Sequence, residues 1–169
     1  MKALSPKPFP ELVEGNPFHK LREGRENLPM THPAFRQIVL DTENARELAE
    51  FYRELLGLIY QPGDEAPPAG EPDPAGADWL VLLGEDERRL LAFQQVDKLE
   101  KATWPEGPRP QQLHLDFSVR TLDDLRTHNI RALSLGATLL DDRIDDPAEA
   151  LVVLADPAGH PFCIFVTTD

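Results

Sequence analysis

The residues best suited to chemistry lie on one face of the stretch Leu113–Val119. His114, Asp116 and Ser118 alternate there with apolar residues. A period of two predicts a β-strand with one buried face and one polar face. The imidazole of His114 could bind a metal, act as a general base or serve as a structural hydrogen-bonding group. Asp116 on the same face could complete a metal site, orient His114 or remain hydrated.

A similar strand is predicted earlier in the chain, over Phe35–Asp41. Gln37, Val39 and Asp41 share one face of it. The elements that follow the two strands come in the same order, although few residues are identical between the copies. We therefore expect the chain to contain one module twice, each copy burying its apolar surface with the help of the other.

The first module continues with a helix. Thr42 is its expected N-cap, and Gly57 ends it because glycine readily takes the positive φ of a helix C-terminus. The apolar stripe of this helix consists of Ala45, Leu48, Ala49, Tyr52, Leu55 and Leu56. Strands are predicted over 58–60, 79–83 and 90–96, and the Pro- and Gly-rich stretch 62–76 is predicted to be a surface insert.

The second module repeats this order. Thr121 followed by Asp124 resembles a capping box, and Gly136 closes the helix. The expected apolar stripe is Leu122, Leu125, Ala132 and Leu133. Three strands follow, over 137–140, 150–154 and 162–166, with the turn DPAGHP before the last one.

These elements predict one domain over residues 34–168. Module one covers 34–98, a Pro-rich linker covers 99–110, and module two covers 111–168. Residues 1–33 are rich in proline and mixed charges, so we expect a flexible arm. Met30, directly before the first patterned stretch, is an alternative translation start.

Composition excludes several classes of protein. The formal net charge of -13 over 169 residues argues against nucleic-acid binding, which requires clustered Lys and Arg. No apolar run approaches the roughly 20 residues of a membrane helix, so no membrane contact is expected. Cys163 is the only cysteine and cannot form an internal disulfide, which fits a reducing, cytoplasmic location.

Several motifs together resemble the vicinal oxygen chelate superfamily, the glyoxalase and bleomycin-resistance group, and most of all its glyoxalase-like proteins of the actinobacterial type. They are AEFYRELLGL after the first strand, LHLDFSV at the start of module two, LGA closing the second helix, LAFQQV in the fourth strand, and DPAGHPFCIF. The resemblance covers about residues 34–167. It implies an α+β fold of two tandem βαβββ modules that form a curled mixed sheet around a shared cavity, and homodimers are common among such proteins.

The resemblance also implies four positions for metal ligands, two from each module. Here they are Gln37, Ala92, His114 and Cys163. Alanine has no donor atom, so the site is degenerate and only Gln37 and His114 are expected as ligands. Gln94 lies two residues from Ala92 on the same face of its strand. We expect no bound metal, with a divalent ion (zinc, nickel, iron or manganese) as the alternative.

Cys163 and the aromatic residues each have two interpretations. Cys163, between apolar neighbours, is expected to be a small buried residue, although a nucleophilic pair with His114 is conceivable. His160 in the preceding turn is expected to be exposed to solvent. Phe93 and the other aromatic residues are expected to pack the core, and at the rim of a cavity they could instead stack on a ligand.

Three functions are consistent with these observations. The leading hypothesis is a glyoxalase-like protein that binds a small organic molecule between the modules, with Gln37, Gln94, His114, Phe93 and Cys163 as ligand-binding residues. The second is a metal-dependent lyase, isomerase or dioxygenase in which His114 and Asp116 are catalytic. The third is a resistance-type protein that sequesters an antibiotic or toxin without chemistry.

Overall fold

The computed structural model describes residues 32–167, so nearly all of the predicted arm lies outside the described residues. Both predicted modules belong to one compact unit that begins at Arg36. None of the helices between residues 32 and 167 is long and apolar enough to cross a lipid bilayer.

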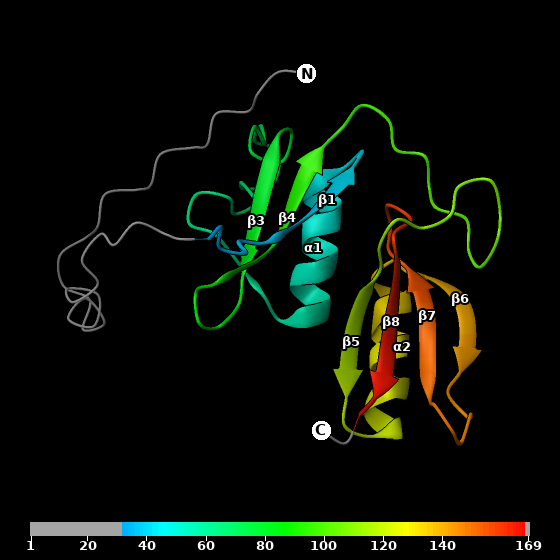
Figure 1. Ribbon diagram of the computed structural model, residues 1–169. Coiled ribbons are helices and arrows are strands. Elements are labelled where there is room, and N and C mark those ends of the chain that lie inside the picture. Colours follow the sequence, from blue (N-terminus) through cyan, green and yellow to red (C-terminus); the bar gives the residue numbers. More distant parts are fainter. Residues whose placement is uncertain (1–31, 168–169) are drawn as a thin grey trace. The chain divides into compact units, whose positions relative to one another are not determined.

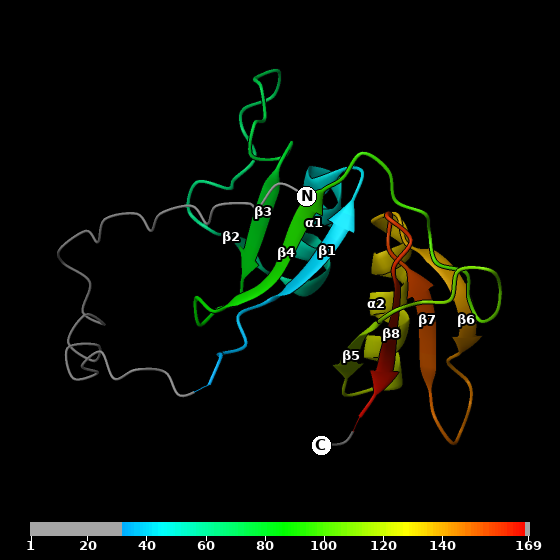
Figure 2. The same cartoon turned by 45° about the horizontal axis from the view of Figure 1, so that its top comes forward.

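Module one consists of one helix and four strands, and the strands form a single sheet (Figure 1). The first and last strands pair in parallel, and the other neighbours are antiparallel, which gives the strand order β1-β4-β3-β2. Figure 2 shows β1 beside β4 along this sheet. The elements are β1 (Ile38–Thr42), α1 (Ala45–Leu56), β2 (Ile59–Tyr60), β3 (Trp79–Leu83) and β4 (Arg89–Gln95).

Module two repeats the same topology, with the strand order β5-β8-β7-β6 and a parallel pair formed by β5 and β8. The duplicated βαβββ architecture predicted from the sequence is therefore confirmed. The strands form two separate four-stranded sheets, which are not closed into one. The elements are β5 (Leu115–Val119), α2 (Leu122–Ser134), β6 (Thr138–Arg143), β7 (Leu151–Ala155) and β8 (Pro161–Val166).

Helix α1 begins two residues later than predicted. Its N-cap is Asn44, whose Oδ1 accepts a hydrogen bond from the backbone N–H of Glu47 at 3.1 Å. Thr42, the predicted cap, is the last residue of β1, and its hydroxyl accepts from the N–H of Asn44. The predicted end is confirmed, since Gly57 has a left-handed φ of 67°.

Helix α2 begins as predicted, with the Thr121 hydroxyl accepting from the N–H of Asp124. Its predicted apolar stripe is partly wrong. Leu125 and Ala132 are buried together with Asn129, at the spacing of one helix face. Leu122 and Leu133 lie at the edge of that face and are 42% and 39% exposed.

The hydrophobic core is shared by the two modules, and α1 provides much of it. Phe51 on α1 contacts Phe162 on β8 with a ring-centroid distance of 5.9 Å. Tyr52 packs against Phe93 of its own module and against Phe117 of module two. Edge-to-face and stacked rings of this kind add to the stabilisation from apolar burial.

One hydrogen bond inside this core also joins the modules. The Tyr52 hydroxyl donates to Oδ2 of Asp156 at 2.9 Å, and both side chains are almost completely buried. Burial and the neighbouring carboxylate raise the pKa of Tyr52 well above its usual value, so the phenol stays protonated and keeps donating.

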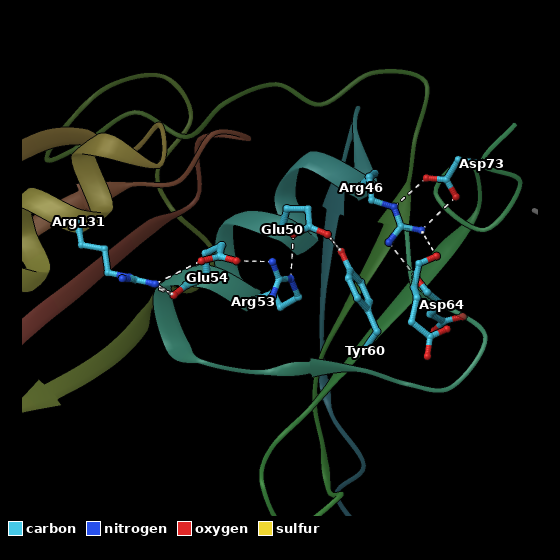
Figure 3. Close-up of polar contacts among 9 residues, drawn as sticks. Arg46, Glu50, Arg53, Glu54, Tyr60, Asp64, Asp73 and Arg131 are labelled. Atoms are coloured by element: carbon cyan, nitrogen blue, oxygen red, sulfur yellow. Dashed lines mark hydrogen bonds and ion pairs between the residues drawn. The ribbon is translucent and has the colours of Figure 1, made fainter. Parts of the chain in front are cut away.

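The predicted surface insert is held on α1 by Arg46 (Figure 3). Its guanidinium binds the Asp73 carboxylate through Nε and Nη2, and it donates through Nη1 to the carbonyl of Asp64. It also lies over the ring of Tyr60, 4.8 Å from the centroid. A planar, forked cation suits this set of partners better than an ammonium would.

Figure 3 also shows Tyr60, whose hydroxyl donates to a carboxylate as that of Tyr52 does. Tyr60 is half-buried and its hydroxyl donates to Oε1 of Glu50 at 2.8 Å. Tyr52 and Tyr60 therefore make the same kind of hydrogen bond in different surroundings.

Removing the two hydroxyls should have unequal effects. Tyr52→Phe should lower the free energy of unfolding by about 2 kcal/mol, because it takes one donor from a buried carboxylate. Tyr60→Phe, the matched control, should cost less than about 1 kcal/mol, because water can replace the lost donor at Glu50. Urea unfolding of the two variants measures both values. Equal losses would contradict the central role of the Tyr52–Asp156 bond.

Candidate functional site

The strand registers relate the candidate residues of the two modules to each other. In module one Val39 pairs with Ala92, and in module two Asp116 pairs with Cys163. Gln37 and His114 each lie two residues before the first member of these pairs. Gln37 therefore corresponds to His114 and Ala92 to Cys163, in agreement with the correspondence expected from the sequence.

In module two, His114, Asp116 and Cys163 lie together, and we call them the module-two cluster. One potential ligand atom from each lies within 4.8 Å of the other two. Nε2 of His114 is 3.4 Å from Oδ1 of Asp116. His114 immediately precedes β5, Asp116 lies on β5, and Cys163 lies on the neighbouring strand β8. The parallel pairing of the first and last strands thus brings an imidazole, a carboxylate and a thiol together.

The Cys163 thiol is half-buried and is not an activated nucleophile. Burial raises its pKa above the usual value, and the negative charge of Asp116, to which the thiol is hydrogen-bonded, raises it further. A thiol attacks as the thiolate, so its reactivity falls as its pKa rises.

Module one offers no matching set of donors. Ala92 is completely buried and has no ligand atom, and the Gln37 amide oxygen accepts from Arg89 at 3.5 Å. The four positions implied by the resemblance therefore do not fit a metal held by both modules. Among the described residues, a metal would have to be held by the imidazole, carboxylate and thiol of the module-two cluster alone, a combination compatible with zinc.

A cleft of about 810 Å³ borders that cluster at Gln111, whose Nε2 lies 3.5 Å from Nδ1 of His114. One wall is the face of the module-one sheet that α1 does not cover, including Val39, Asp41 and Gln94. The other walls are linker residues between Leu99 and Leu113 and the turn Ala158–Pro161. None of the three residues of the module-two cluster lines it.

Three cleft residues form a row across the module-one sheet. Asp41 on β1 pairs with Gln94 on β4, and Gln94 pairs with Trp79 on β3. A carboxylate, an amide and an indole thus stand side by side. The neighbouring row, Val39–Ala92–Val81, is apolar, and of these three residues only Val39 lines the cleft.

The sequence predictions for this region have mixed outcomes. Gln94 does line the cleft. Phe93 points to the opposite face of β4, is 0% exposed and stacks on Tyr52, so the structure does not bring it to the cleft. Trp79, Lys101 and His160 line the cleft and were not among the predicted site residues.

His160 was predicted to be exposed in its turn, and this is wrong. Its side chain is only 20% exposed, and Nδ1 lies 2.9 Å from Oδ2 of Asp156. The backbone N–H groups of Gly159 and His160 donate to the other carboxylate oxygen. The pattern Asp-Pro-Ala-Gly-His contains a signal for this turn, because Asp side chains accept hydrogen bonds from nearby backbone in turns.

Comparison with known proteins agrees with this architecture. The family model described as a glyoxalase-like domain matches residues 37–165, which include both modules and the linker. This chain belongs to the glyoxalase-like domain family. No curated protein sequence matches it significantly.

Solved structures with the same fold are distant in sequence from this glyoxalase-like domain. A glyoxalase/dioxygenase from Nostoc punctiforme has a TM-score of 0.59 at 17% identity, covering 86% of this chain and 98% of its own. A glyoxalase/bleomycin resistance protein/dioxygenase family enzyme from Burkholderia phytofirmans PsJN has a TM-score of 0.55 at 15% identity, with 77% and 95% covered. The fosfomycin resistance protein FosX from Mesorhizobium loti has a TM-score of 0.55 at 14% identity, covering 82% of this chain and 95% of its own.

These similarities establish the fold of the vicinal oxygen chelate superfamily for this glyoxalase-like domain. Its chemistry has to be argued from its own residues, because one fold supports many activities. The glyoxalase-like domain offers two places for such chemistry, namely the module-two cluster and the cleft.

The reactivity of Cys163 in this glyoxalase-like domain should depend on Asp116. Asp116→Asn should lower the pKa of Cys163 and speed its alkylation by iodoacetamide at neutral pH, because the nearby negative charge that disfavours the thiolate is removed. The matched control is Asp123→Asn, which changes an exposed residue of α2 and should leave the rate of alkylation unchanged. The pH–rate profile of metal-free protein measures both effects, and an unchanged profile in Asp116→Asn would contradict the coupling.

Proposed function

We propose that this protein binds a small, planar organic molecule in the cleft, without a metal held by both modules. The row Asp41–Gln94–Trp79 carries the proposal. An indole offers a flat apolar surface, while the amide and the carboxylate beside it can pair with polar groups at the edge of a ring.

The size and lining of the cleft support the same proposal. Its volume of about 810 Å³ falls within the usual range for small-molecule sites, roughly 300–1,000 Å³. Val39, Leu99 and Pro108 provide apolar surface around the row. The charges in the lining are mixed, with Asp41 and Glu100 acidic and Lys101 and Arg109 basic, which favours a neutral or weakly acidic ligand over a highly charged one.

A metal-dependent reaction is the second candidate, and the module-two cluster favours it. A divalent ion bound there would act as a Lewis acid toward oxygen atoms of a substrate, with His114, Asp116 and Cys163 holding it. Sequestration of a toxic molecule differs from the metal-dependent reaction in that the ligand is recovered intact. The homodimer and the cytoplasmic location expected from the sequence stay predictions.

Fluorescence of Trp79 tests binding in the cleft. In a Trp104→Phe background, planar phenols and nitrogen heterocycles should quench the remaining tryptophan with saturation. Gln94→Ala should weaken the affinity by about fivefold, which corresponds to the loss of one hydrogen bond of about 1 kcal/mol.

Gln61→Ala is the matched control for this experiment, because it removes an amide outside the cleft, and it should bind normally. Linear, non-saturating quenching, or equal affinity in the Gln94→Ala and control variants, would refute the proposed site.

Metal content separates the two candidate functions. Protein purified without chelator and without an affinity metal should contain no stoichiometric divalent ion, because Ala92 has no ligand atom and the Gln37 amide oxygen accepts a hydrogen bond from Arg89. Elemental analysis of the natural sequence, His114→Ala and the control His128→Ala measures this. A nearly stoichiometric metal that is lost only in His114→Ala would overturn the metal-free proposal in favour of the metal-dependent reaction.

A further inference from the structure

The turn Asp156–His160 contains a buried hydrogen-bond network that reaches the cleft. Asp156 has a side chain that is 0% exposed, and each of its carboxylate oxygens accepts two hydrogen bonds. The backbone of the turn supplies the two donors to Oδ1. The Tyr52 hydroxyl and Nδ1 of His160 are hydrogen-bonded to the other oxygen, Oδ2, each at 2.9 Å.

This arrangement fixes the tautomer of the neutral His160 ring. Because the carboxylate accepts, Nδ1 of His160 carries the proton in the neutral ring and Nε2 keeps its lone pair. Tyr52 cannot replace His160 as a proton acceptor, since burial and Asp156 raise its pKa well above the usual value. The lone pair of Nε2 is therefore a proton acceptor whose orientation the core determines.

Nε2 is the ring nitrogen that does not face Asp156. The Asp156 side chain is fully buried, whereas His160 lines the cleft and its side chain is 20% exposed. We therefore assign Nε2 to the part of His160 that a ligand in the cleft can reach. The aliphatic part of Lys101 lies against Gly159, where φ is +98°, and holds the turn on its other side.

Closing the turn does not by itself require an imidazole at position 160. The turn is already closed by the N–H groups of Gly159 and His160 on Oδ1 of Asp156, and neither bond involves a side chain at position 160. A polar atom elsewhere in the lining of the cleft has no hydrogen-bond partner among the described residues. Oε1 of Gln111 is buried and accepts no hydrogen bond from any described residue.

We infer that the cleft takes a ring-bearing ligand with a weakly acidic O–H or N–H group, and that Nε2 of His160 accepts its proton. The O–H or N–H bond of the ligand breaks, its electron pair stays on the ligand, and the proton forms a new bond to Nε2. Asp156 stabilises the resulting imidazolium as a positioning residue. This inference rests on the proposed function, since the ligand must first bind in the cleft.

Other charged groups act on the same proton. Asp41 and Glu100 also line the cleft and favour the imidazolium but disfavour an anionic ligand, whereas Lys101 and Arg109 do the reverse. Arg109 is paired with Glu100 at 3.0 Å, and Nζ of Lys101 donates to the carbonyl of Pro157. Asp156 is the one carboxylate among these groups within hydrogen-bond distance of the His160 ring in the described structure.

The probe for this step is 4-nitrophenol, whose ionised form is yellow and whose hydroxyl titrates near neutrality. Trp79 quenching reports binding, and the absorbance of the bound fraction reports ionisation. In the natural sequence the pKa of the bound phenol should be lower than in His160→Asn by about one unit, a tenfold change in the ratio of ionised to neutral probe.

The choice of variant separates the proton acceptor from the fold. His160→Asn keeps an N–H donor near the position of Nδ1 and removes only the titrating nitrogen. His128→Asn, on α2, is the matched control and should behave like the natural sequence. Asp156→Asn should move the ring proton of His160 from Nδ1 to Nε2, which ¹⁵N NMR detects and which loss of stability alone would not produce.

The outcomes distinguish the two proposals. Saturable quenching of Trp79, together with a tenfold fall in the ionised-to-neutral ratio of the bound 4-nitrophenol in His160→Asn, supports both the binding site and the proton transfer. Quenching with equal ionisation in the natural sequence and His160→Asn overturns the proton transfer and leaves the binding site intact. Absence of saturable quenching at high 4-nitrophenol overturns the cleft as a site for such rings, and the proton transfer with it. An unchanged tautomer in Asp156→Asn overturns the positioning role.

Discussion

The hydrogen bond between Tyr52 and Asp156 is the constraint on which most of the arrangement depends. It joins the two modules within their shared core, where the Tyr52 ring contacts Phe51, Phe93 and Phe162. A buried carboxylate is tolerated only when its acceptors are satisfied, so the phenol, the turn backbone and the His160 ring must all be in place together. The packing of α1 and the position of the cleft-lining turn are therefore coupled through one side chain.

Much of the fold could be predicted because local patterns determine it. Alternating apolar residues located the strands, and Gly57 ended α1 at the expected residue. The prediction failed where tertiary contacts choose between similar residues. Thr42 and Asn44 are both good N-caps, and β1 extends through Thr42, which leaves the cap to Asn44. In α2 the sequence offered several leucines, and packing selected the face of Leu125.

The candidate site was only partly predictable. Aligning the two modules gave the correspondence of Gln37 with His114, and the resemblance to the superfamily implied that of Ala92 with Cys163. The strand registers agree with both. A cavity was expected from the resemblance, but the contribution of the linker and a turn to its walls was not foreseen, since neither has a periodic pattern. The partial burial of His160 was also missed. Its partner is Asp156, whose carboxylate is bonded to Tyr52 on a helix of the other module, a contact that the local sequence of the turn does not reveal.

The separation along the chain between Tyr52 and Asp156, 104 positions, has a consequence for synthesis on the ribosome. Every strand of the first sheet is available once Gln95 has emerged, so that sheet can pair early. The side of α1 that carries Phe51 has to wait for Phe162, near the end of the chain. During translation the nascent chain therefore carries an uncovered aromatic surface, the kind of segment that chaperones recognise and that favours aggregation when elongation stalls.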